Sequence, residues 1–145
     1  PSSSAIPLAV RRAQDMFVLM FLLRGLPFVD LAYLRKSDLR DNVITYRRRK
    51  TGRPLSVTLT PEALELLKKY MNRDSHSPYL FSLLKSGEGT KEAYREYQLA
   101  LRHFNYQLEL LGRFLGLKDR LSSYVGRHKG FPFLLKFNSL QNISA

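Results

Sequence analysis

The chain contains no cysteine, which excludes a disulfide scaffold and a cysteine-based zinc site. Its histidines, His76, His103 and His128, show no ligand spacing, so we expect no metal site and no cofactor. Acidic residues are scarce as well: 12 Asp and Glu stand against 24 Lys and Arg, a formal net charge of +12. Such an excess bears on partners more than on fold, and DNA or RNA is the first candidate.

Long apolar runs are also absent. The longest, MFVLMFLL at residues 16–23, is far shorter than the roughly 20 residues that cross a bilayer. Arg24 follows it directly, without a small-residue cleavage site, so the run predicts a buried helix and neither a membrane span nor a signal peptide. We therefore expect a cytoplasmic protein with no membrane partner.

Hydrophobic residues make up 44% of the 145 positions, enough for the core of one domain. Apolar periodicity and capping residues predict four helices: residues 8–23, the segment PFVDLAYL, the segment TPEALELLKKYM capped by Thr60, and about residues 91–115. The stretch NVITYRRRKTGRPLSVTLT predicts a hairpin with Lys50 at its tip. The expected fold is mainly α with a small β-hairpin or sheet, an α+β class.

Basic residues concentrate in this hairpin. The segment YRRRKTGR carries five cations in eight positions, a pattern that favours phosphate contacts but has low specificity. The candidate DNA-binding residues are Arg47, Arg48, Arg49 and Arg53. Strand alternation would place Arg47 and Arg49 on one face and Arg48 and Lys50 on the other. A solvated hairpin that binds nothing accounts for the same residues.

The expected last long helix carries an apolar stripe with alternating spacings of three and four. Its members are Tyr94, Tyr97, Leu101, Phe104, Leu108, Leu111 and Leu115. This stripe fits either a coiled-coil dimer or a helix that faces the core of one domain, and its aromatic residues favour the core.

Four segments, taken in order, resemble the catalytic domain of tyrosine recombinases, the phage-integrase family. The branch found in Bacteroides-type mobile elements is the most similar. The segments are DMFVLMFLLRGLPFVDLAYLRKSDL, YRRRKTGRPLSVTLTPEALELLKKY, YLFSLL and YREYQLALRHFNYQLELLGRFLGLKDRLSSYVGRH. The resemblance implies a partial catalytic domain over residues 1–128, with the fold of DNA breaking-rejoining enzymes.

The resemblance also implies an activity. Such enzymes integrate or recombine DNA at specific sites without metal, through a tyrosine that attacks a phosphodiester and forms a phosphotyrosine. Two arginines stabilise the charge on the scissile phosphate, and a hairpin lysine protonates the leaving oxygen. The implied partners are duplex attachment sites and further recombinase protomers in a synaptic complex.

Carried over residue by residue, the family pattern assigns Arg127 and His128 in YVGRH to the second arginine and its neighbouring histidine. Lys50 matches the hairpin lysine. Tyr124 occupies the place where many relatives have a histidine, and a core aromatic is the alternative. The first arginine of the family would fall at Pro27 in this sequence. Arg24 stands three residues earlier, as the corresponding arginine often does in the same branch. The alternative is that Arg24 has only a structural role at a corner of the chain.

The resemblance ends after His128. The segment KGFPFLLKFNSLQNISA, residues 129–145, does not match the family, and none of the eight tyrosines lies beyond position 124, so the nucleophile is missing from its expected place. Three explanations are open: a frameshifted gene, a truncated chain, or a diverged regulator that binds DNA without cutting it. The abrupt change favours a frameshift. The usual amino-terminal DNA-clamping domain is missing too. We expect weak DNA binding without cleavage. Rival hypotheses are a non-catalytic basic DNA- or RNA-binding module and a helical interaction protein.

Overall fold

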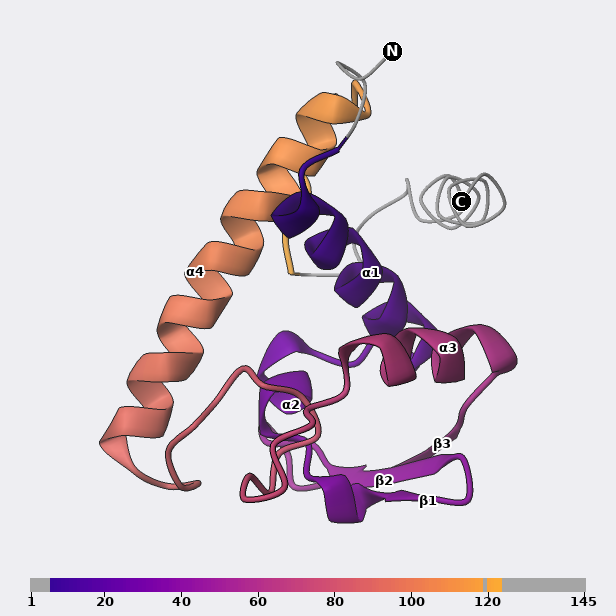
Figure 1. Cartoon of the computed structure of the whole chain (residues 1–145), viewed down its shortest axis with the longest axis vertical. Helices are drawn as coiled ribbons and strands as arrows, with labels where there is room; N and C mark the ends of the chain where they lie inside the picture. Colours follow the sequence, from indigo (N-terminus) through magenta and orange to yellow (C-terminus); the bar gives the residue numbers. More distant parts are fainter. Residues whose placement is uncertain (1–5, 119, 124–145) are drawn as a thin grey trace.

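The computed structural model describes residues 6–118 and 120–123 and combines four α-helices with a small sheet (Figure 1). The helices are α1 (Leu8–Leu22), α2 (Phe28–Tyr33), α3 (Pro61–Tyr70) and α4 (Lys91–Phe114), with a short 3-10 turn, η2, at Lys36–Asp38. The strands are β1 (Leu39–Arg40), β2 (Val43–Arg47) and β3 (Pro54–Thr58), paired antiparallel in the order β1-β2-β3. The predicted α+β class is confirmed.

Two helices begin at residues that the sequence marks as caps. The Thr60 hydroxyl accepts a hydrogen bond from the Ala63 N–H at 3.1 Å, and Pro61 takes the first position of α3. The Thr90 hydroxyl accepts one from the Ala93 N–H at 3.1 Å at the start of α4. Each cap satisfies a backbone donor that has no partner inside its helix, which fixes where the helix starts.

The sheet confirms the predicted hairpin and adds a strand. In the hairpin Ile44 pairs with Val57, and both side chains are buried. Strand β2 ends at Arg47, so the alternation predicted for residues 48–50 is wrong; these residues lie in the loop. The additional strand, β1, turns into β2 through Asp41 and Asn42, whose φ angles of 49° and 65° suit a two-residue hairpin turn.

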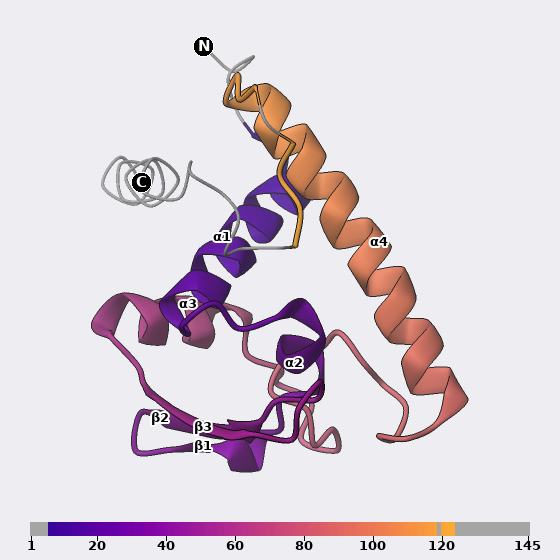
Figure 2. The same cartoon turned by 180° about the vertical axis from the view of Figure 1, so that it is seen from behind.

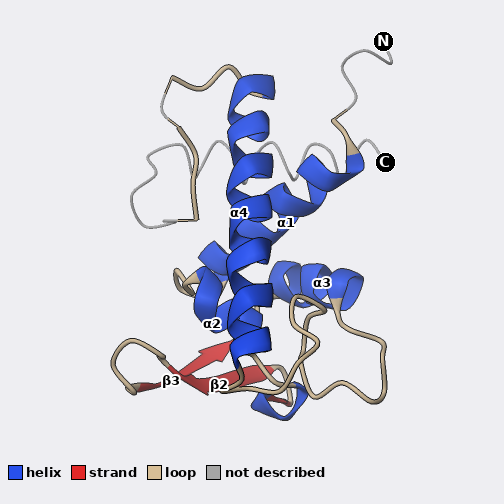
Figure 3. Cartoon of the chain, turned by 90° about the vertical axis from the view of Figure 1, so that its left-hand side faces the viewer, coloured by secondary structure: helices blue, strands red, loops and turns tan. Residues whose placement is uncertain are grey.

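The sheet lies at one end of the molecule, with α2 and α3 between it and α1 (Figures 1 and 2). Helix α4 begins near the sheet and runs along α1 to the opposite end (Figure 3). The core between these layers holds fully buried side chains such as Phe17, Met20 and Leu31. None of the described helices has the length and apolarity to span a membrane.

The apolar stripe on α4 faces this core over its middle part. Phe104, Leu108 and Leu111 are buried, and Phe104 stacks on Phe28 of α2 with ring centroids 4.6 Å apart. Tyr94, in the first turn of the helix, is 56% exposed. The core-facing interpretation is therefore correct for the middle of the stripe, whose side chains are already packed within the chain.

After α4 the chain reverses direction. Gly116 adopts a φ of 68°, and the Leu117 N–H donates to the Gly112 carbonyl at 2.9 Å. Leu121 is buried in the core, and the Ser123 N–H donates to the Asn105 side-chain oxygen at 2.8 Å. The last described residues therefore run back along α4.

Replacing Leu108 with Ala tests the contact between α1 and α4. This fully buried side chain leaves a cavity, so we expect a loss of about 2–5 kcal/mol in the free energy of unfolding. Leu99→Ala is the matched control, because Leu99 lies on the same helix and is 62% exposed; we expect a change within about 0.5 kcal/mol. Urea unfolding followed by circular dichroism measures both, and equal losses would contradict the assignment of this face to the core.

Candidate nucleic-acid interface

The tip of the β2–β3 hairpin is a closed basic loop over residues 48–53. The Arg48 N–H donates to the Arg53 carbonyl at 2.9 Å, and the Gly52 N–H donates to the Arg48 carbonyl at 2.6 Å. Gly52 has a φ of 74°, which a glycine adopts without strain. The Arg47 guanidinium donates to the Gly52 carbonyl at 3.0 Å, and Lys50 lies exposed in the turn. The loop thus exposes Lys50 on a backbone whose conformation is fixed by hydrogen bonds.

Helix α2 holds this loop in place. The Arg49 N–H donates to the Oδ1 of Asp30 at 3.0 Å, and Asp30 lies buried in the first turn of α2. Burial raises the pKa of Asp30, and the Arg49 N–H bond and the charges of Arg48 and Arg49 oppose that rise. The carboxylate therefore ties the hairpin tip to α2 across 19 residues of sequence.

The Arg49 side chain is engaged within the protein. Its guanidinium carbon lies 3.7 Å from the centroid of the Tyr33 ring, and its Nη1 donates to Glu88 Oε2 at 2.8 Å. Arg35 donates to the other oxygen, Oε1 of Glu88, from Nη2 at 2.8 Å and from Nε at 3.2 Å. These hydrogen bonds, Arg35 first and then Arg49, lower the pKa of Glu88. A hollow of about 200 Å³ lies among these groups.

Arg24 occupies a corner that ordinary side chains avoid. It follows α1 with a φ of 64°, and Gly25 follows with a φ of 72°. The Arg24 N–H donates to the Phe21 carbonyl at 2.9 Å, and the Leu26 N–H donates to the Met20 carbonyl at 3.0 Å. A left-handed conformation costs a non-glycine residue about 1–2 kcal/mol. Arg24 is exposed, and strained backbone of this kind is concentrated at functional sites.

The predicted site residues divide into three groups. Arg47, Arg48, Lys50 and Arg53 lie at the hairpin tip, where the Arg49 side chain is bonded to Glu88 and lies on Tyr33. Arg24 lies in the corner between α1 and α2, and the hairpin tip is held by Asp30 in the first turn of α2. Tyr124, Arg127 and His128 lie outside the described residues.

Several described tyrosines are poorly suited to attack a phosphate as phenolates. Burial raises the pKa of Tyr46 and of Tyr79. The pKa of Tyr70 is raised by burial and by its hydrogen bond to the carboxylate of Asp15. A raised pKa stabilises the neutral phenol, which is the weaker nucleophile. Tyr46, Tyr70 and Tyr79 therefore favour their neutral phenol forms.

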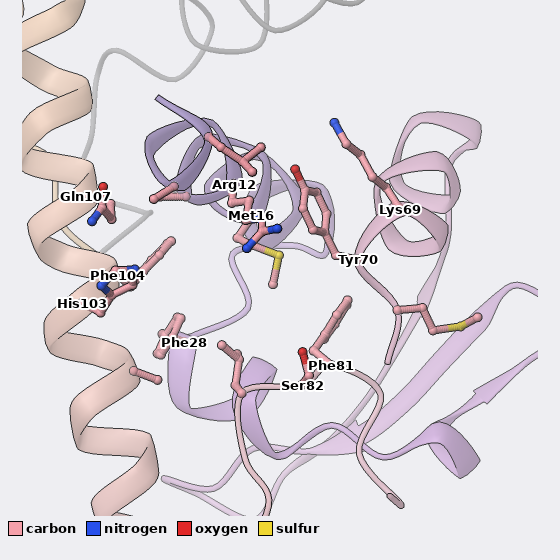
Figure 4. Close-up of a pocket in the computed structure, with 16 residues that line it drawn as sticks. Arg12, Met16, Phe28, Lys69, Tyr70, Phe81, Ser82, His103, Phe104 and Gln107 are labelled. Atoms are coloured by element: carbon pink, nitrogen blue, oxygen red, sulfur yellow. The ribbon is translucent and has the colours of Figure 1, made fainter. Parts of the chain in front are cut away.

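A second hollow, of about 570 Å³, opens between α1, α3 and α4 (Figure 4). Its lining is mainly apolar and includes Met16, Phe28, Phe81 and Phe104. Lys69, one of its basic residues, donates to buried Asp15 at 3.2 Å, as does the Tyr70 hydroxyl at shorter range. This hollow offers less to a phosphate than the hairpin tip does. Within residues 6–118 and 120–123, no cluster of three or more His, Asp or Glu side chains is arranged to hold a metal ion.

Sequence reasoning missed the cluster around Glu88. Its arginine partners lie 53 and 39 residues away in the chain, and no spacing rule links them. The flanking glycines, Gly87 and Gly89, are the one local signal that Glu88 sits at the tip of a tight loop. The role of Arg49 as an internal tie was missed for the same reason.

No family model and no curated protein matches the sequence. The fold is similar to the crystal structure of XerA recombinase, with a TM-score of 0.51 and 18% sequence identity over 90% of this chain. The match covers 47% of the recombinase chain, so this chain spans about half of that protein's length. At this identity the likeness concerns the fold, a helix-rich unit with a small antiparallel sheet.

The left-handed corner leads to a test of Arg24. Arg24→Gly removes the strain as well as the side chain, whereas Arg24→Ala removes the side chain alone. We expect the glycine variant to exceed the alanine variant by about 1 kcal/mol in free energy of unfolding, measured by urea denaturation. An alanine variant as stable as the glycine variant would contradict the assigned backbone conformation.

Proposed function

We propose that this chain is part of the catalytic domain of a site-specific tyrosine recombinase and that it binds duplex DNA through the β2–β3 hairpin. The observation that carries the proposal is the anchored basic tip, in which exposed Lys50 stands beside an arginine fixed to α2. The fold likeness to XerA recombinase supports it, as do the sequence segments that resemble the integrase family. The net charge of +12 provides the long-range attraction to DNA.

In the proposed site Arg24, Lys50, Tyr124, Arg127 and His128 act on one phosphodiester. Arg24 and Arg127 would donate to the non-bridging oxygens, since a guanidinium fork matches two phosphate oxygens. Lys50 would donate a proton to the leaving 5′ oxygen as general acid. His128 would support the phosphate site beside Arg127, and Tyr124 would donate a hydrogen bond from its hydroxyl. Arg47, Arg48 and Arg53 would contact neighbouring phosphates, while Arg49 positions the loop.

The proposed partners are duplex attachment sites and further recombinase protomers in a synaptic complex. The chain as it stands would bind DNA without cutting it, because no tyrosine follows position 124. Binding and cleavage are therefore separate expectations and need separate experiments.

DNA binding is tested by the salt dependence of affinity for a fluorescent 20-base-pair duplex. We expect a clear negative log–log slope, and Lys50→Ala should reduce its magnitude by about 0.9, the value for one phosphate contact. Lys118→Ala is the matched control, since this exposed lysine lies beyond the far end of α4. A slope near zero for the unmodified chain would exclude a DNA surface of this kind.

Comparing Arg127→Ala with Lys50→Ala in the same assay separates the proposed site from a merely basic hairpin. If both side chains act on one phosphate, the double variant should lose less than the sum of the two single losses. A non-catalytic basic module predicts instead that Arg127→Ala has no effect.

Cleavage is tested with a nicked suicide duplex, which traps a covalent protein–DNA product. We expect none from this chain, because an attacking tyrosine is missing from the family position. Denaturing gel electrophoresis reads out the product. A covalent band that survives denaturation would show that another residue serves as the nucleophile.

A further inference from the structure

Glu88 holds two arginines in an arrangement that also suits a phosphate. Its two oxygens are divided between them, with Oε1 on Arg35 and Oε2 on Arg49, each at 2.8 Å. A carboxylate and a phosphate present comparable oxygen pairs to guanidinium groups. All three side chains remain at least 36% exposed, so solvent and a ligand can reach them.

The arginine on the hairpin would keep its place without Glu88. Its backbone N–H is held by Asp30, and its guanidinium lies on the Tyr33 ring. The backbone N–H of Arg35 is held separately, by Asp38 Oδ2 at 2.9 Å. The side chain and backbone of Arg49 are therefore positioned by contacts that do not involve Glu88, and so is the backbone of Arg35. The other nearby carboxylates, Asp30 and Asp38, already accept from backbone donors.

Glu88, in contrast, sits on a short tip between two firm anchors. On one side Glu96 accepts from the backbone N–H groups of Lys85 and Ser86, at 2.9 and 3.0 Å. On the other side Thr90 caps α4 and donates to the Gly87 carbonyl at 2.6 Å. Between them Gly89 has a φ of 87°. Glycine on each side of Glu88 allows its backbone to swing while the anchors stay fixed.

We propose that Arg35 and Arg49 form a second phosphate-binding site, which Glu88 covers in the free protein and leaves when a DNA backbone phosphate takes its place. This inference rests on the proposed DNA binding and adds to it a site that the basic loop alone does not include. Exposed ion pairs contribute about 0–1 kcal/mol each, so a phosphate that offers equivalent hydrogen bonds can displace the carboxylate. Glu88 thereby lowers the affinity for DNA that reaches this pair, because the phosphate must first displace the carboxylate.

Glu88→Gln tests the proposal, with the full chain and the same fluorescent duplex. Removing the competing charge should steepen the log–log salt slope by about 0.9 and tighten binding roughly threefold to tenfold. Glu65→Gln is the matched control, because it makes the same change in net charge at an exposed position of α3. The double variant Arg35→Gln/Glu88→Gln should return the slope toward that of the unmodified chain.

The outcomes separate the two proposals. If the unmodified chain binds with a salt-dependent affinity but Glu88→Gln binds no more tightly than Glu65→Gln, the covered site is wrong and DNA binding stands. Weaker binding by Glu88→Gln, with a lower unfolding midpoint, would mean that Glu88 only braces the hairpin and would also overturn the covered site. If neither the unmodified chain nor Glu88→Gln binds, both proposals fail. Glu88→Asp keeps the charge on a shorter side chain and should give an intermediate slope.

Discussion

The shape of the basic hairpin depends on how Arg49 is held. Five cations within eight residues repel one another, and two short strands alone give a marginal hairpin. Asp30 accepts a hydrogen bond from the Arg49 backbone N–H, the Tyr33 ring lies against its guanidinium, and Glu88 accepts a hydrogen bond from that guanidinium. The three contacts come from α2 and from the loop before α4, so one arginine joins three segments. In the same loop Lys50 and Arg53 remain exposed.

Helices and strands could be predicted from the sequence wherever a residue acts on its immediate neighbours in the chain, as a cap or a turn residue does. Thr60 could be identified as a cap because its hydroxyl replaces a missing backbone partner. The hairpin could be predicted from two β-rich runs and the turn between them, and β2 and β3 pair there. Strand β1 was missed although Asp41 and Asn42 form a recognisable turn, because a two-residue strand leaves no periodicity to detect.

The site was predictable only in part, because its contacts join residues far apart in the chain. The concentration of cations at the hairpin tip is visible in the sequence, and so is the acidic residue of the short helix. No pattern indicated that Arg49 is bonded within the protein, since that depends on Glu88, which lies 39 residues later. The left-handed corner at Arg24 was equally hidden, because arginine is not a residue that predicts a positive φ.

The reversal after α4 has a consequence for whatever follows it. Ser123 is fixed to Asn105, nine residues before the last residue of α4, which corresponds to about 14 Å along the helix axis. The polypeptide therefore leaves the described part beside the middle of α4, on the return toward the end that carries the sheet. The length of the bend around Gly116 sets that point of departure. Inserting or deleting a residue there would change which turn of α4 lies beside Ser123, so the length of this bend fixes where the described chain meets the helix.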